Sequence, residues 1–238
     1  VGLKEDALPM ILGCDAAGLD EDGNEVVVHA VVSEPGWSGD ETLDPRRSLL
    51  SEKHQGTFAD RVVVPRRNVV PKPPSLSFEE AACLPTAWLT AYRMLFTQGA
   101  LKPGDTVLVQ GAGGGVATAL IALAHAGGLR VYATSRDEAK RARALELGAD
   151  EVFESNARLP EKVDAVMETV GRATWDHSIR SLRPGGRIVI CGHTSGPQPE
   201  DAHLTRIFFL QLSVVGSTMG SREELGDLVR LLESSGAR

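Results

Sequence analysis

Apolar strands alternate with amphipathic helices along the second half of the chain. From residue 107 onward, short apolar runs rich in Val are separated by segments of helical periodicity, some of which end in glycine. Six strands joined by helices predict an α/β fold with a doubly wound parallel Rossmann sheet, because right-handed crossovers place helices on both faces. The predicted strands are residues 107–110, 130–135, 150–155, 163–170, 187–192 and 213–218, and the predicted helices are 117–126, 137–148, 174–182 and 222–234.

The first half of the chain has the pattern of β structure interrupted by loops and prolines. Valine-rich runs predict strands at residues 23–32 and 58–65, with an irregular loop between them. The prolines of VVPKPPSLS interrupt regular structure, and Ser77-Phe78-Glu79-Glu80 has the form of a capping box. We therefore expect a helix that begins at Ser77 and ends at Pro85, then a second helix over 86–96. The same interruption predicts a small β domain at residues 1–76 and a larger α/β domain at 77–238.

Composition and charge narrow the class of protein. The 238 residues are 42% hydrophobic and 24% charged, with no apolar run of eighteen residues, so neither a membrane span nor a signal segment is predicted. The net charge of −7 argues against a nucleic acid partner, because phosphate backbones are bound by clustered Lys and Arg. Cys14, Cys83 and Cys191 form no C-x-x-C motif, which favours a reducing compartment such as the cytoplasm. A small-molecule partner is expected.

A glycine run in DTVLVQGAGGGVATAL follows a predicted strand and opens a predicted helix. That context is the one a dinucleotide fingerprint requires, because glycines let the backbone turn tightly and approach a pyrophosphate at the helix N-terminus. The run ends on Ala117, where the fingerprint accepts alanine in place of glycine. A glycine turn without a ligand is the alternative. The predicted phosphate loop comprises Gly111, Ala112, Gly113, Gly114, Gly115 and Val116.

The end of the second α/β strand predicts which nucleotide is bound. NAD-dependent enzymes place an acid there to bind the ribose 2′-hydroxyl, whereas NADP-dependent enzymes place a cation. The segment ATSRDEAK has Ser135 and Arg136 at this point, and Lys140 follows one helical turn later. A hydroxyl with two cations suits a 2′-phosphate, which favours NADP(H) as cofactor. The alternative is that Arg136 and Lys140 only solvate a helix start beside Asp137.

With these residues in view, the chain resembles the medium-chain dehydrogenase/reductases, and within them the quinone oxidoreductase and zinc-binding-dehydrogenase-like proteins of the alcohol dehydrogenase superfamily. The resemblance covers nearly the whole chain. It implies a partial GroES-like β domain before the Rossmann domain, with family segments missing at both ends. The segments that carry the resemblance are LPMILGCDAAG, GTFADRVVVP, LSFEEAACLPTAWLTAY, LKPGDTVLVQGAGGGVA, ELGADEVF, ETVG, SLRPGGRIVICGHTSG and VVGSTMGS, in the family's order.

The resemblance also implies which segments would contact the nicotinamide. His193 is a candidate proton donor, although a solvated histidine explains it as well, and no catalytic residue is assigned. Family members often pair through the edge of the Rossmann sheet, which implies a homodimer. The implied nicotinamide contacts are Val170, Gly171, Gly192, His193, Thr194, Gly216, Ser217 and Thr218, with Thr90, Phe208 and Phe209 lining the cleft.

Metal ligands are sparse in the positions where the family carries them. Structural zinc needs four cysteines in a closely spaced lobe, and residues 33–55 contain no cysteine. At the catalytic position of zinc-dependent members this chain has Gly13-Cys14-Asp15, and His54 lies near the family's second ligand pair. Cys14 could bind a metal, but no second Cys or His pattern supports it. We expect no metal.

The expected activity is hydride transfer from NADPH to a quinone, an enone or a carbonyl without zinc. Without a Lewis acid to ionise an alcohol, reduction is the natural direction, and the protein supplies geometry and a dry cleft. Three alternatives remain at this point. They are a zinc-dependent alcohol dehydrogenase, a non-catalytic NADPH-binding protein, and an S-adenosylmethionine methyltransferase, whose usual acid is replaced here by Ser135.

Overall fold

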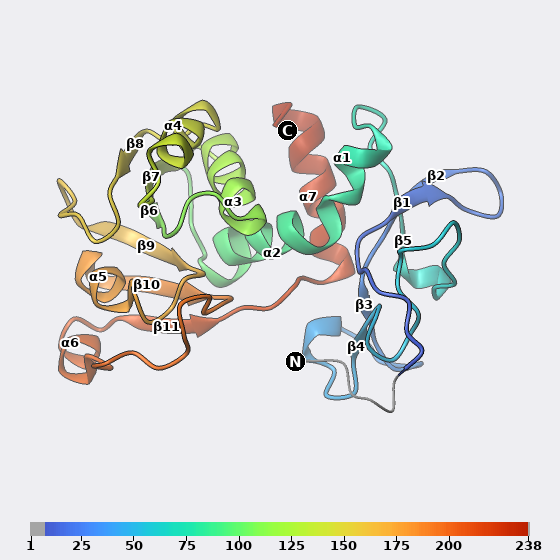
Figure 1. Cartoon of the computed structure of the whole chain (residues 1–238), viewed down its shortest axis with the longest axis horizontal. Helices are drawn as coiled ribbons and strands as arrows, with labels where there is room; N and C mark the ends of the chain where they lie inside the picture. The colour runs from blue at the N-terminus through green and yellow to red at the C-terminus, as the bar shows by residue number, and fades with distance from the viewer. Residues whose placement is uncertain (1–7, 238) are drawn as a thin grey trace. The chain divides into compact units, whose positions relative to one another are not determined.

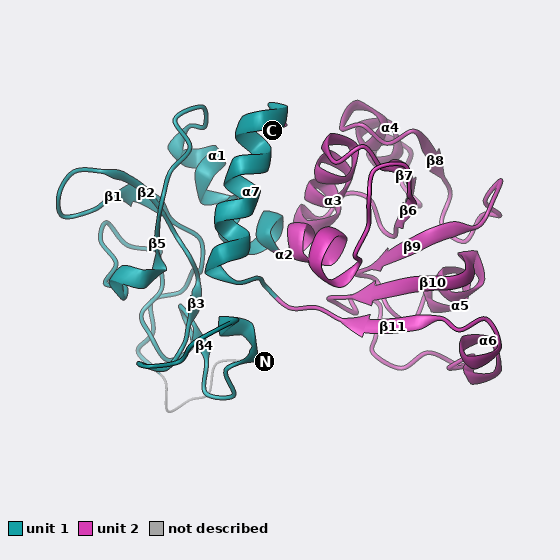
Figure 2. Cartoon of the chain, turned by 180° about the vertical axis from the view of Figure 1, so that it is seen from behind, with its two compact units in different colours: residues 1–89, 219–236, 238 teal, residues 90–218, 237 magenta. Residues whose placement is uncertain are grey.

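A computed structural model describes residues 8–237, which divide into two compact units (Figure 2). Within the described residues, unit 1 comprises 8–89 and 219–236, and unit 2 comprises 90–218 and 237. The predicted domain boundary lies earlier, between residues 76 and 77, and assigns 219–236 to the second domain. Compact units defined by proximity need not be domains that fold alone, so that boundary stays a prediction.

Unit 2 is built on a six-stranded sheet in which all neighbouring strands are parallel (Figure 1). The strand order is β11-β10-β9-β6-β7-β8, so the chain adds strands in one direction from β6 and in the other from β9. This is the predicted doubly wound Rossmann arrangement, which is confirmed. The strands are β6 (Thr106–Val109), β7 (Arg130–Thr134), β8 (Glu151–Phe153), β9 (Val163–Glu168), β10 (Leu182–Ile190) and β11 (Ser213–Gly216).

Helices pack against this sheet through their apolar residues. α3 (Gly115–Ala126) contacts β6 and β7, α4 (Glu138–Glu146) contacts β7 and β8, and α5 (Trp175–Ser181) contacts β9 and β10. Since right-handed crossovers run in opposite directions from the centre of the sheet, α3 and α4 cover one face and α5 the other. The core under α5 consists of Leu108, Tyr132, Val163, Val166, Ile179, Leu182, Ile188 and Leu212.

The centre of the sheet is the place where ligands bind in such folds. β6 and β9 are neighbours in parallel register, with Val107 beside Ala165 and Val109 beside Met167. The chain leaves their carboxyl ends toward opposite faces, which opens a crevice there. The glycine loop follows β6, and the Thr169–Gly171 turn follows β9, so the fold places two predicted segments at this crevice.

Unit 1 contains short antiparallel strands and two capped helices. β1 (Ala17–Leu19), β2 (Glu25–Val28) and β5 (Val69–Pro71) form one sheet, while β3 (Val31–Val32) pairs with β4 (Ser48–Leu49). Short 3-10 turns occupy Glu41–Leu43 and Arg66–Asn68. α1 (Phe78–Ala82) begins at the predicted capping box of Ser77 and Glu80, which is confirmed. α7 (Arg222–Ser235) begins at a second capping box and ends before Gly236.

Three predictions about elements in the first half were wrong. Residues 58–65 form no strand: β2 pairs with β1 and β5 instead, and Val63 is 95% exposed. The predicted strand 23–32 breaks at His29 and Ala30 into β2 and β3. Pro85 does not end the helical segment: it sits in the first turn of a π-helical stretch, Leu84–Trp88, where the missing N–H is not needed.

Helical structure continues from there through α2 (Leu89–Tyr92) and a second π-helical stretch, Arg93–Gln98. The sequence also gave no indication of α6 (Leu204–Phe209), a short helix whose preceding residue, His203, has φ of 56°. No helix among residues 8–237 is long and apolar enough to cross a membrane.

Candidate functional site

The glycine loop between β6 and α3 exposes its backbone. Gly111 has φ of 76° and Gly113 has φ of 131°, a region that favours glycine. A Cβ on Gly111 would lie 2.6 Å from Cγ2 of Val170, and a Cβ on Gly113 would lie 2.5 Å from Cδ of Lys140. Gly114 differs, because a Cβ there would meet no heavy atom within 4 Å. The space beside Gly114 is therefore open to a ligand.

The N-terminus of α3 is suited to bind an anion. Its N-cap is Gly114, which offers no side chain to the first backbone N–H groups of the helix. Those groups carry partial positive charge and need an acceptor, which a phosphate provides. Ala117 is buried in the first turn, where its small side chain keeps the helix close to the sheet.

The end of β7 brings Ser135, Arg136 and Lys140 beside the glycine loop. Ser135 is buried, its N–H donates to the Phe153 carbonyl, and its hydroxyl accepts from the Asp137 N–H at 3.2 Å. Asp137 is the N-cap of α4 and accepts from the Lys140 N–H at 3.1 Å. The Asp137 carboxylate therefore caps the N-terminus of α4. Arg136 is exposed, and no ion pair joins it to a carboxylate within residues 8–237.

The loops after β9 and β10 are held together by backbone contacts. The Ser195 N–H donates to the Val170 carbonyl at 2.8 Å, and the Ser195 hydroxyl donates to the same oxygen at 2.7 Å. Gly171 has φ of 86°, and a Cβ there would lie 2.6 Å from the Gly196 carbonyl oxygen and 2.9 Å from Cα of His193. The structure therefore brings the Val170–Gly171 turn against the segment 192–196, where His193 and Thr194 are exposed.

The end of β11 joins the same edge of the sheet. The Ser217 N–H donates to the Ile190 carbonyl at 2.8 Å, which fixes residues 216–218 beside the end of β10. The Ser217 hydroxyl is buried and has no hydrogen-bond partner among the described residues. An unsatisfied buried hydroxyl at the carboxyl edge of the sheet suits a polar ligand, because such groups are normally paired.

A buried carboxylate, Glu168, organises the turn after β9. It accepts from the backbone N–H groups of Val170 at 2.7 Å and Gly171 at 2.9 Å. It also accepts from the Thr174 hydroxyl at 2.9 and 3.0 Å and from the Ser178 hydroxyl at 2.5 Å. Glu168 is fully buried, so these donors replace the water that an ionised carboxylate would otherwise need.

Gln110 connects this carboxylate to the glycine loop. Its amide nitrogen donates to the Ser178 hydroxyl at 2.9 Å and to Nδ1 of His177 at 2.8 Å, and its amide oxygen accepts from the Thr134 hydroxyl at 2.5 Å. His177 donates from Nε2 to the Ala157 carbonyl at 2.7 Å. Burial lowers the pKa of His177, which agrees with a neutral ring that accepts at Nδ1.

This network was missed by the sequence interpretation. Glu168 is the last residue of β9, in the run VDAVMETV, and it is fully buried. An acid at the end of a buried strand is the signal that could have found it. Gln110 directly follows β6, and Thr134 is the last residue of β7. Their spatial relation depends on strand order, which local patterns do not encode.

Cys191 also lies next to Glu168, and its reactivity gives a first testable prediction. Burial, with the nearby Glu168 carboxylate, raises the pKa of the Cys191 thiol to about 11. The nucleophilic thiolate is therefore scarce below that pH and increases as the pH rises toward 11. In a timed alkylation with iodoacetamide at pH 8, followed by peptide mass spectrometry, exposed Cys83 should be modified well before Cys191. Equal rates at the two cysteines would contradict this environment.

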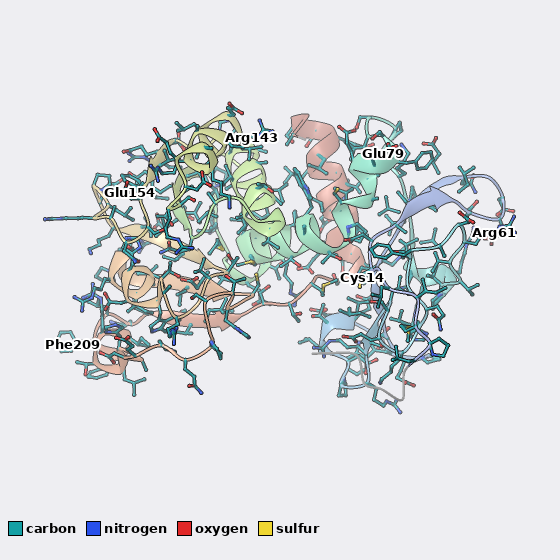
Figure 3. The ribbon with its side chains drawn as sticks, viewed as in Figure 1. Cys14, Arg61, Glu79, Arg143, Glu154 and Phe209 are labelled. Carbon is teal, nitrogen blue, oxygen red and sulfur yellow. The ribbon has the colours of Figure 1, made fainter. Side chains whose placement is uncertain are left out.

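Two of the predicted cofactor contacts, Phe208 and Phe209, lie apart from the rest, and a third, Thr90, makes no hydrogen bond to the loops described above. Thr90 is buried in α2, and no hydrogen bond links it to these loops within residues 8–237. Phe208 and Phe209 lie on α6, which precedes β11 and therefore belongs to the amino edge of the sheet. They are 68% and 76% exposed, and Figure 3 shows Phe209 projecting away from the sheet. The structure does not bring these two rings to the glycine loop.

The candidate metal ligands lie in unit 1. The Cys14 thiol donates to the Leu50 carbonyl at 3.1 Å and lies 3.5 Å from the Ser51 hydroxyl, while His54 is exposed. Burial raises the pKa of Asp15, against the effect of hydrogen bonds from Thr86. Among residues 8–237, no group of three or more His, Cys, Asp or Glu side chains is arranged to hold a metal ion.

The unit 2 residues together fit a dinucleotide. Three features suit phosphates. They are the glycine loop, which a Cβ would obstruct, the uncapped start of α3, and the cations at the end of β7. The Ser217 hydroxyl, which has no hydrogen-bond partner among the described residues, lies at the same edge of the sheet.

Comparison with known proteins agrees with this arrangement. Residues 115–234 match the model of the family described as zinc-binding dehydrogenase. The chain is 31% identical to acryloyl-coenzyme A reductase of Sulfurisphaera tokodaii, over 82% of this chain and 60% of that protein. It is 29% identical to quinone oxidoreductase of Mus musculus, over 97% of this chain and 70% of that protein.

Solved structures of similar proteins have the same fold. An NAD-dependent alcohol dehydrogenase superposes with a TM-score of 0.89 at 36% identity, covering 97% of this chain and 74% of that chain. A 2-octenoyl-CoA carboxylase reductase in complex with NADP and 2-octenoyl-CoA superposes with a TM-score of 0.87 at 28% identity, covering 94% and 60%. The chain spans about three fifths of the length of acryloyl-coenzyme A reductase and of crotonyl-CoA reductase of Streptomyces collinus.

Proposed function

Because the chain belongs to the zinc-binding dehydrogenase family of medium-chain dehydrogenase/reductases, we propose that it is an NADPH-dependent oxidoreductase of the quinone oxidoreductase type. Its substrate would be a quinone, an enone or a carbonyl compound, reduced without zinc. The observation that carries the proposal is the group of Ser135, Arg136 and Lys140 beside the glycine loop, with the neighbouring Asp137 carboxylate used as a helix cap.

Different residues of unit 2 would bind different parts of NADPH. The N–H groups at the start of α3 would hold the pyrophosphate, and Arg136 and Lys140 would hold the 2′-phosphate through charge-assisted hydrogen bonds. Val170, Gly171, Gly192, His193, Thr194, Gly216 and Ser217 would orient the nicotinamide, which supplies a hydride when NADPH is bound. Glu168 fixes two of these positions through their N–H groups. We assign no proton donor.

We propose a reaction without zinc because the sequence lacks the ligands that zinc needs. The segment 33–55 lacks the cysteines of a structural zinc lobe, and Cys14 uses its thiol proton for the Leu50 carbonyl. A zinc-dependent alcohol dehydrogenase is the competing activity. One zinc per chain by metal analysis of the purified protein, with activity lost on chelation and restored by zinc, would replace the proposal by that alternative.

We also propose a homodimer formed through the free edge of the sheet, in the cytoplasm, with no nucleic acid or membrane partner. β11 is one of the two edge strands of this sheet, and exposed apolar side chains of Leu204, Phe208, Phe209 and Val214 lie on α6 and β11. The three cysteines are free, as in a reducing compartment. A monomer mass near 25.4 kDa in sedimentation equilibrium would contradict the dimer.

A titration with NADPH and NADH tests the cofactor proposal. We expect the chain to bind NADPH more tightly than NADH, and Arg136→Ala to weaken NADPH roughly tenfold or more while changing NADH little, since a lost charge-assisted bond costs about 1.5–3 kcal/mol. Nicotinamide fluorescence measures both affinities. Arg143→Ala, which removes an exposed arginine that pairs with Glu146 on α4, is the matched control.

The outcomes separate the functional alternatives. Equal losses of NADPH and NADH affinity in Arg136→Ala would remove the case for a 2′-phosphate contact. Selective NADPH binding without consumption of NADPH in the presence of quinones, enones or carbonyls would favour a non-catalytic binding protein. Selective binding with turnover supports the full proposal.

A further inference from the structure

A cavity lies in unit 2, away from the glycine loop. It has a volume of about 610 Å³ and is formed between the loop that precedes β9 and one side of α5. None of residues 111–116 lines it. A cavity of this size is within the range that holds small molecules. The proposed NADPH site does not account for it.

The carboxylates at this cavity are already neutralised by partners. Glu161 forms an ion pair with Arg130 and accepts from the Tyr132 hydroxyl at 3.0 Å. Asp176 lies 2.8 Å from Nε of Arg180 and 2.8 Å from Nε2 of His203. Both acids at the cavity therefore have cationic and hydrogen-bonding partners, although Glu161 shares Arg130 with Glu151.

Two cations at the same cavity have no such partner. Arg158 is exposed, and it forms no ion pair within residues 8–237. Lys162 donates from Nζ to the Arg180 carbonyl at 2.6 Å and forms no ion pair in the same range. Burial and the charges of Arg206, Arg158 and Arg180 lower the pKa of Lys162, and no carboxylate is among the causes.

Capping of α5 accounts for only part of this positive charge. Lys162 and Arg206 both donate to the last carbonyls of α5, whose partial negative charge is about half of one elementary charge. Arg158 has no such role. The side chains that line the cavity include three cations and two acids, so it keeps an excess of positive charge that an anion would balance.

We propose that this cavity binds the phosphate group of a small molecule through Arg158 and Lys162. A phosphate carries close to two negative charges at neutral pH, and its three free oxygens can accept from both cations at once. The amide of Asn156 and the α5 side chains on the opposite wall would contact the remainder of the ligand. The proposal is independent of the nucleotide site.

Chemical-shift mapping of the ¹⁵N-labelled chain tests the proposal. Inorganic phosphate and phenyl phosphate are titrated separately at pH 7.5, with sodium chloride of equal ionic strength as the reference. We expect saturable shifts of the backbone amides around Arg158, Lys162 and Arg180 with at least one of the two phosphates and not with chloride. Tighter binding of phenyl phosphate indicates an organic phosphate, and equal affinity indicates free phosphate.

Two variants and a matched control complete the test. Arg158→Gln and Lys162→Gln should each weaken binding at the cavity about tenfold, because each removes a charge-assisted bond. Arg158 is exposed and makes no ion pair, so Arg158→Gln stays informative if Lys162→Gln is unstable. Arg183→Gln, which removes an exposed cation paired with Asp164, should bind like the unchanged chain.

Three results would overturn the proposal. These are shifts confined to residues 111–116 and 135–140, equal shifts with chloride, and unchanged affinity in Arg158→Gln.

Discussion

Gly114→Val is expected to abolish NADPH binding while leaving the protein folded. The position has ordinary backbone geometry, with φ of −91°, and a Cβ there would meet nothing within 4 Å. The new side chain would therefore project into open space and strain nothing in the free protein. That open space lies at the start of α3, where the proposed pyrophosphate must approach the backbone. We expect a loss of affinity of at least about a hundredfold, which corresponds to about 3 kcal/mol.

The matched control is Gly18→Val in β1. This glycine also has no heavy atom within 4 Å of an added Cβ, but it lies in unit 1. Both variants should keep the circular dichroism spectrum and melting temperature of the unchanged chain within a few degrees. Nicotinamide fluorescence then compares their NADPH affinities. Retained NADPH binding by folded Gly114→Val would show that the nucleotide does not approach this loop.

Glu168→Ala is expected to destabilise unit 2 substantially. The carboxylate accepts from two backbone N–H groups and two hydroxyl groups in a buried position. Most of these donors would be left unsatisfied, since only the Thr174 hydroxyl has another acceptor among the described residues, the Gly171 carbonyl at 3.3 Å. Unpaired buried donors cost about 1–3 kcal/mol each, and water entering the space would recover part of this. We expect the free energy of unfolding to fall by about 3 kcal/mol, or roughly 6–12 °C in melting temperature.

Glu154→Ala provides the comparison for this change. Glu154 follows β8, its side chain is 78% exposed, and its nearest cation is Arg141 at 3.8 Å (Figure 3). An exposed ion pair of this kind contributes little, so the expected change is below about 1 kcal/mol. Urea unfolding followed by circular dichroism measures both variants. Similar stabilities of the two variants would mean that the donors around Glu168 find other acceptors.

Glu168→Ala should also affect the proposed nicotinamide contacts. The Val170 and Gly171 N–H groups bind Glu168, and Gly171 packs against His193 and the carbonyl of Gly196. Release of the turn after β9 would therefore loosen the loop after β10 as well. The effect reaches the ligand through backbone position, so Glu168 acts as a positioning residue and not as a catalytic one.

The sequence by itself determined the architecture of the α/β half. Strand runs such as 163–170, the helix ends at Gly127 and Gly148, and the glycine run at 111–115 are local signals, because each depends on residues that are neighbours along the chain. The capping box at Ser77 is equally local, and the structure confirms it. For the same reason, the Ser135, Arg136 and Lys140 group can be proposed as a phosphate site from the sequence alone.

Only the tertiary structure decided which segments meet across the sheet. β5 pairs with β2 although residues 58–65 carry the stronger valine pattern, because an edge of a strand accepts one partner and β5 occupies it. Phe208 and Phe209 lie at the amino edge because α6 precedes β11. The joining of Gln110, Thr134 and Glu168 depends on β6 lying between β7 and β9. Strand order and pairing arise from contacts between distant residues, which local patterns of polarity do not specify.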